Sequence, residues 1–368
     1  AIVGQVFGWM LASMLGVWFL LAYRQGFRNM PSEIESEKRV AADIETMMSY
    51  GLPLYVGALV STVLAQYQNI VLAFFTSNAE IGNFNAAVNF GALIAILATP
   101  VATALFPAFS KLDLHSRKEE LQRMFEYSVK YTTLLIIPLA ILIAALSKDL
   151  IRAVYGAAYA YASLYLSLYV GTFLLTSIGY QVISAFLNGV GRTRETLKIA
   201  LVQLAIFLPA APVAAWLYRV PGLIVALVFS ALVSTSFGLW LATRRYGMRV
   251  NLKDSVATLA AASASAIPSL LLVYRSTLPS LVNIFIAGLI YLVAYLTLAP
   301  LFRAVKRTDL QLLAPILDQI KILRPATDLI FAYETRLLSV QRWSQVGHRR
   351  LQESWRGLES GLQSGHRV

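Results

Sequence analysis

LVNIFIAGLIYLVAYLTLAPLF, residues 281–302, is a run of 22 residues without one charged side chain. A helix rises about 1.5 Å per residue, so this run is long enough to cross the roughly 30 Å hydrocarbon core of a bilayer. As a helix it satisfies its own backbone hydrogen bonds, which lipid cannot do for it. The stretch therefore predicts a transmembrane helix.

Similar windows recur along the whole chain, which is 58% hydrophobic and only 14% charged, with a mean hydropathy of +0.64. A buried helix of a soluble core would carry charges at helical spacing, and these windows carry almost none. We predict an all-α, polytopic transmembrane bundle of about nine spanning helices. The windows are Ile2–Tyr23, Leu52–Thr76, Phe84–Phe109, Tyr127–Ser147, Ala162–Leu187, Ile199–Tyr218, Val220–Thr243, Val256–Tyr274 and Leu281–Phe302.

The net charge is +12, and most of the basic residues lie in the loops between these windows and in the tail. Alternate loops hold fifteen Lys and Arg residues on one side and four on the other. Basic loops are retained in the cytoplasm, so the richer side is predicted to be cytoplasmic. The same alternation places the basic carboxy-terminal tail in the cytoplasm. We predict a multi-pass protein of the cytoplasmic membrane, without a nucleic-acid partner, because no nucleic-acid-binding motif accompanies the charge.

Enzyme chemistry finds little support in the sequence. The chain has no cysteine, and its histidines, His115, His348 and His366, are scattered in one loop and the tail. A metal cluster or a histidine dyad needs such residues close together. No phosphate-binding loop pattern is present either. We predict that the protein is not an enzyme and uses no cofactor.

The candidate binding residues are mainly neutral groups inside or at the ends of the windows, since all nineteen acidic residues lie outside them. In a purely structural role these groups would form hydrogen bonds between helices. In a functional role they would line a cavity that binds sugar hydroxyls. Lys130 either extends its side chain to the headgroups or binds substrate. The candidates are Gln66, Gln68, Asn69, Asn85, Asn89, Lys130, Tyr180, Gln181, Asn188, Arg192 and Arg194.

Six short motifs in order resemble one known family. They are GLPLYVG at 51–57, EIGNFNAA at 80–87, PVATALFPAFSK at 100–111, YGAAY at 155–159, NGVGR at 188–192 and TDLQLL at 308–313. In this order they resemble the carboxy-terminal half of polysaccharide flippases of the multidrug, oligosaccharidyl-lipid and polysaccharide exporter superfamily. Many relatives carry an acid followed by a base midway along the second window, where this chain has Gln68 and Asn69.

The resemblance implies two six-helix lobes facing a central cavity, of which this chain supplies the second. Residues 1–23 are then the last helix of a truncated amino-terminal lobe, an expectation that the first residue, Ala1, supports. Residues 24–50 form a cytoplasmic amphipathic linker, 51–243 the six-helix lobe, and 244–303 two additional helices. Residues 304–368 form a basic cytoplasmic tail that is either interfacial helix or a packed extension.

The implied function is alternating-access flipping of a lipid-linked oligosaccharide or polysaccharide precursor across the membrane. Its expected partners are the lipid-linked sugar, the bilayer and cytoplasmic glycosyltransferases. One alternative is a drug or organic-cation antiporter of the same fold, which predicts an acidic cavity. The other is a non-transporting membrane scaffold that acts through its tail.

Overall fold

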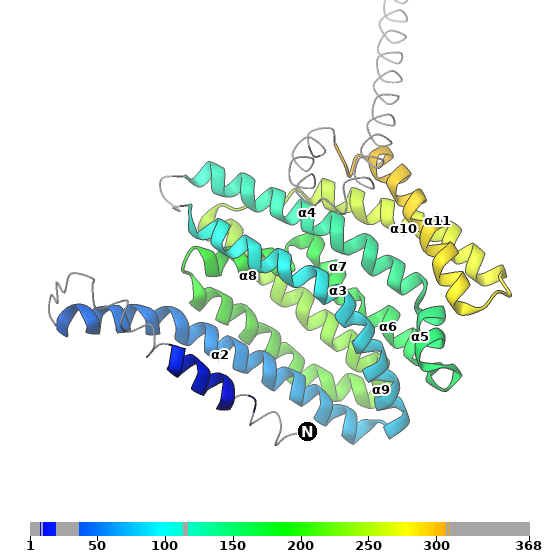
Figure 1. Cartoon of the computed structure of the whole chain (residues 1–368), viewed down its shortest axis with the longest axis horizontal. Helices are drawn as coiled ribbons and strands as arrows, with labels where there is room; N and C mark the ends of the chain where they lie inside the picture. Colours follow the sequence, from blue (N-terminus) through cyan, green and yellow to red (C-terminus); the bar gives the residue numbers. More distant parts are fainter. Residues whose placement is uncertain (1–7, 9, 20–36, 113–116, 307–308, 310–368) are drawn as a thin grey trace, which may run out of the picture. The chain divides into compact units, whose positions relative to one another are not determined.

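Every regular element in the described part of the chain is helical, which confirms the predicted fold class (Figure 1). The structure is a computed structural model that describes residues 8, 10–19, 37–112, 117–306 and 309. Its α-helices are α2 (Glu37–Phe75), α3 (Asn78–Ser110), α4 (Lys118–Ala145), α5 (Ser147–Tyr155), α6 (Ala162–Tyr169), α7 (Gly171–Leu174), α8 (Tyr180–Gly189), α9 (Thr193–Tyr246), α10 (Leu252–Arg275) and α11 (Ser280–Leu301). Two 3₁₀ turns cover Ala157–Tyr159 and Leu175–Ile178.

Six described helices, and one bent pair of helices taken together, are long and apolar enough to cross a membrane. The chain is therefore a multi-pass membrane protein. The bent pair joins Ala162–Ile178 to Tyr180–Gly189 at an angle of 50°. Since α9 contains two predicted windows, eight of the nine windows correspond to described helical segments. Of the remaining window, residues 2–23, the structure describes a short apolar helix, Met10–Phe19.

Two units make up the chain, Ala1–Ser49 and Tyr50–Val368. Residues 37–49 of the first unit, which we predicted as part of a linker, form the opening turns of α2. The tail beyond residue 309 lies outside the described residues. The division into a truncated lobe, linker, six-helix lobe and tail stays a prediction.

Helix α9 is a hairpin rather than one straight rod. At Arg219 the backbone has φ 52° and ψ −133°, which interrupts the helix between its two arms. Near the open end of the hairpin, Arg245 Nη1 lies 2.6 Å from Glu195 Oε1, although 50 residues separate them. A straight helix would hold residues 50 apart at about 75 Å. The two arms therefore match the predicted windows 199–218 and 220–243.

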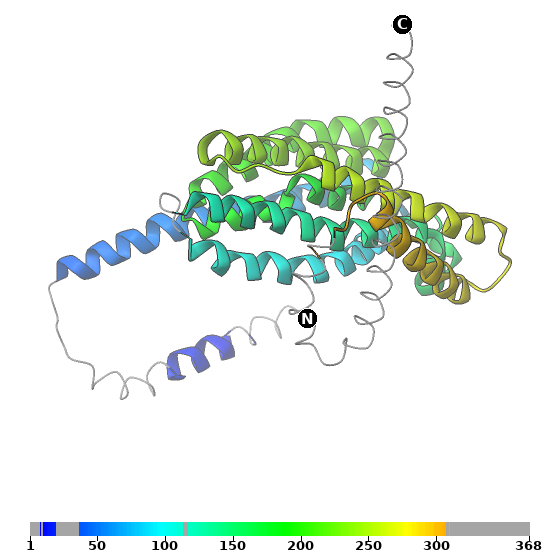
Figure 2. The same ribbon diagram turned by 90° about the horizontal axis from the view of Figure 1, so that it is seen from above.

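Helix α4 packs against neighbours on several sides, including α3, α10 and the bent pair. Its inward side chains, such as Phe125, Val129 and Ile136, are almost fully buried. The α10–α11 hairpin packs against α4 and α5 at one edge of this unit (Figure 2). Much of the outer surface is exposed leucine, valine and aromatic side chain, as expected where lipid is the solvent.

Two helix breaks have positive φ, at Gly179 and at Arg219, and Pro221 closely follows the second. Gly179 adopts φ 91°, in the left-handed region that favours glycine. By contrast, Pro100, Pro138 and Pro268 lie inside helices that continue past them.

A capping box starts α3. The Ser77 hydroxyl accepts from the Glu80 amide at 3.3 Å, and the Glu80 carboxylate accepts from the Ser77 amide at 2.9 Å. We expect Ser77→Ala to lower the free energy of unfolding by about 1 kcal/mol, because one amide loses its acceptor. Denaturant unfolding in detergent measures the change. Ser110→Ala, near the other end of α3, is the control and should leave stability unchanged.

Candidate functional site

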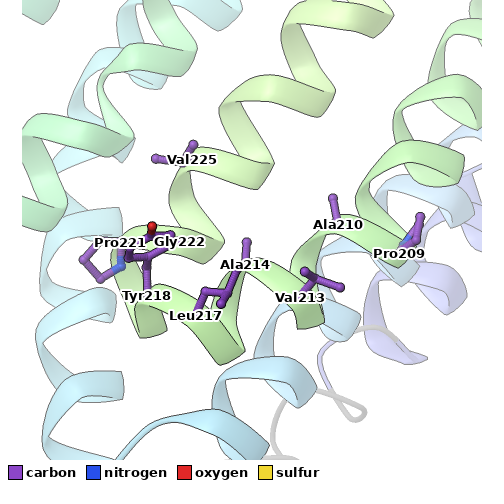
Figure 3. Close-up of a pocket in the computed structure, with 9 residues that line it drawn as sticks. All are labelled: Pro209, Ala210, Val213, Ala214, Leu217, Tyr218, Pro221, Gly222 and Val225. Atoms are coloured by element: carbon purple, nitrogen blue, oxygen red, sulfur yellow. The ribbon is translucent and has the colours of Figure 1, made fainter.

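Two large cavities lie near the α9 hairpin, and they differ in chemistry. The first, of about 760 Å³, lies between the arms of α9 near their turn. Figure 3 shows Ala210, Val213 and Ala214 on one arm and Val225 on the other, with Tyr218 and Pro221 at the turn. Apart from the Tyr218 hydroxyl its lining side chains are apolar. Such a groove can hold hydrocarbon, but it has few groups that bind a polar ligand.

The second cavity, of about 680 Å³, is bounded by α2, α3, α8 and both arms of α9. Its polar lining residues are Tyr50, Ser61, Thr99, Thr103, Tyr180, Gln181, Ser184, Asn188, Thr196, Gln203, Ser234 and Thr235. Among the described residues that line it, none carries a charge. We call it the polar cavity.

One wall of the polar cavity comes from the broken helix. Because α8 restarts after Gly179, Tyr180, Ser184 and Asn188 recur at intervals of four and share a face. A Cβ at Gly179 would lie 3.3 Å from Val129 Cγ2, so both the positive φ and the close packing favour glycine there. The break thus directs a row of polar side chains into the cavity.

Asn188 joins this wall to two others. The Tyr50 hydroxyl of α2 donates to the Asn188 carbonyl oxygen at 3.0 Å. The Thr196 hydroxyl of α9 donates to Asn188 Oδ1 at 2.7 Å. Asn188 therefore holds α2 and α9 against α8 at one end of the cavity, and its amide nitrogen can still donate to a ligand.

The side-chain oxygen of Gln181 is a hydrogen-bond acceptor to which no described group donates. Its Oε1 is buried and has no hydrogen-bond partner in the described part of the protein. A buried, unsatisfied carbonyl is costly, by about 1–3 kcal/mol. A ligand hydroxyl in the cavity would satisfy it.

The structure brings three of the predicted binding residues to the polar cavity, namely Tyr180, Gln181 and Asn188. Gln68 is half-buried on α2, seven residues beyond the cavity-lining Ser61 and on the same helix face. The exposed Gln66 and Asn69 are not among the described residues that line the cavity.

Other predicted binding residues lie away from the cavity lining. Asn85 and Asn89 are exposed on α3, and Asn89 Nδ2 donates to the Tyr155 hydroxyl at 3.2 Å. Arg192 and Arg194 are exposed where α9 begins. Neither arginine is among the described lining residues. Their assignment to substrate binding stays a prediction.

Lys130 lies in a buried ion-pair network with a carboxylate from the first turn of α10, and its assignment to substrate binding stays a prediction. It is 7% exposed, and its Nζ lies 2.6 Å from Asp309 Oδ2 and 3.3 Å from Asp254 Oδ2. Asp254 also binds Lys306 Nζ, at 2.9 Å from Oδ1. Since a buried ammonium is costly without counter-charges, these carboxylates hold Lys130 inside. They also occupy the charge that we had considered for a substrate.

Sequence reasoning missed several lining residues, of which Gln203 is the clearest. It is the sole amide in the window 199–218, so an isolated polar group in an apolar run was the available signal. Thr99, Thr103 and Ser234 gave no such signal, because hydroxyl side chains in membrane helices commonly bond back to their own helix. All three do so here as well.

Comparisons with known proteins agree with this architecture. Residues 2–164 match the model of a family described as polysaccharide biosynthesis protein. A comparison with curated protein sequences finds no match.

Among solved structures, the chain is similar to the lipid II flippase MurJ in an inward closed conformation. The TM-score is 0.56 and the identity 19%, over 68% of this chain and 53% of that one. It is also similar to a MATE protein in complex with MaD5, with a TM-score of 0.51 and 14% identity, over 81% of this chain and 78% of that one. The chain thus spans about half the length of the flippase. At these identities the likeness establishes the fold.

Proposed function

We propose that the chain, whose fold is similar to that of the lipid II flippase MurJ, forms one lobe of a transporter that flips a lipid-linked oligosaccharide or polysaccharide precursor. The observation that carries this proposal is the chemistry of the polar cavity. Its amides and hydroxyls both donate and accept hydrogen bonds, as sugar hydroxyls do. A cavity of this kind, bounded by membrane helices, suits a neutral polyhydroxylated group.

The broken helix beside the polar cavity is also consistent with transport by alternating access. In alternating access one lobe rocks or gates against the other around a fixed site, and such sites are typically formed by discontinuous helices. In this lobe the break at Gly179 directs Tyr180 and Gln181 toward the polar cavity. The sugar would bind there while its lipid tail stays in the bilayer, and a second lobe facing this one would complete the site. We further propose the cytoplasmic tail and the glycosyltransferase partners on the basis of charge placement and family resemblance.

The described residues give less support to the two alternatives, an organic-cation antiporter and a membrane scaffold. An organic-cation antiporter needs an acid in its cavity, and the described lining of the polar cavity contains none. The scaffold hypothesis relies on the tail, which lies outside the described residues. It predicts that deletion of Lys321–Val368 abolishes function, whereas substitutions in the cavity change nothing.

We expect Gln181→Leu and Gln203→Leu each to slow the transfer of labelled lipid-linked sugar across liposomes by about tenfold, since each removes hydrogen-bonding groups from the cavity. Gln203→Asn, which keeps a shorter amide, should retain part of the rate. The assay uses the full-length protein reconstituted in liposomes.

Thr62→Val is the matched control. Thr62 lies on α2, outside the described cavity lining, and its hydroxyl bonds its own helix at Ala58. This variant should transport at the wild-type rate. Wild-type rates in both glutamine variants, or efflux of ethidium in place of lipid-linked sugar, would contradict the proposal.

A further inference from the structure

A third cavity, lined mainly by polar residues and separate from the polar cavity, lies where α5 meets the α10–α11 turn. Its volume is about 370 Å³. One side is formed by Lys148, Asp149 and Arg152 of α5. The other side is the turn from Ser276 to Pro279 with the start of α11. We call it the α5 pocket.

The α5 pocket contains a buried carboxylate that lacks a partner. Asp149 is 7% exposed, and its Oδ2 has no hydrogen-bond donor in the described residues. Lys148 and Arg152 line the same pocket, yet no described ion pair joins either of them to Asp149. Burying an ionised carboxylate without a partner is costly. The unpartnered Oδ2 therefore marks a place for a cationic donor from outside the protein.

A second subsite in the α5 pocket suits an anion. Lys148 and Arg152 are four apart on α5, so their exposed side chains share one helix face. Across the pocket, α11 begins at Ser280 without a side-chain cap on its first amides. Helix N-termini carry a partial positive charge and free amide donors. Two cations and a helix start thus face the pocket beside one unpaired carboxylate.

The position of the α5 pocket is at the depth of lipid headgroups. Helix α10 has 24 residues and ends at the turn that lines the pocket. Helix α11 has 22 residues and begins there. At about 1.5 Å per residue each helix crosses the hydrocarbon core and ends near the interface. Apolar side chains beside the turn, including Tyr274 and Leu281, are highly exposed and offer a surface for acyl chains.

We propose that the α5 pocket binds the headgroup of a zwitterionic phospholipid that carries a primary ammonium, such as phosphatidylethanolamine. The ammonium donates to Asp149 Oδ2, and the phosphate binds Lys148, Arg152 and the first amides of α11. Ser276 and Asn283 shape the floor, where the Ser276 hydroxyl donates to Asn283 Oδ1 at 2.7 Å. Opposite charges held side by side match this headgroup better than a single ion of either sign.

Native mass spectrometry of the purified protein tests the proposal. The protein is equilibrated with micelles that contain equal amounts of phosphatidylethanolamine, phosphatidylglycerol and phosphatidylcholine with identical acyl chains. We expect retention of phosphatidylethanolamine over each of the others by about tenfold, because only its headgroup has a cationic N–H donor for the carboxylate: the phosphatidylcholine ammonium has no N–H, and the phosphatidylglycerol hydroxyls are neutral. Equal retention of the three lipids would overturn the proposal.

Two variants separate the subsites. Asp149→Asn should reduce the preference for phosphatidylethanolamine toward unity while the protein still binds phosphatidylglycerol. Lys148→Gln combined with Arg152→Gln alters only exposed residues, so it should fold and should lose retention of both lipids. Glu119→Gln, an exposed acid on α4, is the matched control and should behave as wild type. An unchanged preference in Asp149→Asn, unchanged retention in the double variant, or binding of Ca²⁺ alone that depends on Asp149 would overturn the lipid assignment.

Discussion

Lys130→Met is expected to lower the free energy of unfolding by about 3–5 kcal/mol, because it leaves the buried Asp309 carboxylate without its counter-charge. Asp309 is 1% exposed, and its carboxylate also accepts from the Lys306 backbone amide at 2.7 Å. Without Lys130 Nζ, that carboxylate keeps a hydrogen bond but loses its nearest cation. Denaturant unfolding of the purified protein in detergent measures the loss.

Removal of both partners is the sharper test of this ion pair. The double variant Lys130→Met, Asp309→Leu eliminates the buried charges together and leaves Asp254 bound to Lys306. It should therefore be more stable than Lys130→Met alone. Arg123→Met, in an exposed pair with Glu119, is the control and should show no measurable change. A Lys130→Met protein as stable as wild type would show that the pair contributes nothing.

Gly222→Val is expected to prevent the α9 hairpin from closing. A Cβ at position 222 would collide with the backbone carbonyl oxygen of Ala214 and would lie 3.0 Å from Tyr218 Cβ. Backbone cannot move aside as a flexible side chain can, so the arms must separate. Because the polar cavity is lined by both arms, the site would be lost with the hairpin. We expect little monodisperse protein by size-exclusion chromatography.

Gly288→Val provides the comparison for this substitution. Gly288 lies in the middle of α11, and a Cβ there would meet no atom within 4 Å. The same change of residue should therefore leave the amount of folded protein near the wild-type value. Equal yields from both variants would mean that the close approach at the α9 turn does not constrain the fold.

The sequence by itself determined the helical class and the approximate extent of the spans. Runs of about twenty apolar residues without charge admit few structures other than membrane helices. Tyr180, Gln181 and Asn188 were recognisable from the sequence as polar groups against an apolar background, and all three line the polar cavity; their role in binding stays a prediction.

Only the tertiary structure decided which polar groups meet. Lys130 and Asp309 are 179 residues apart, and nothing in the local pattern of either indicates the other. Gln203 reaches the polar cavity because α9 folds back at Arg219, where the backbone adopts a conformation that the residue type itself disfavours. Short-range sequence patterns record local geometry and the solvent around each helix. Partners across helices are chosen by packing, which sums contacts from many distant positions.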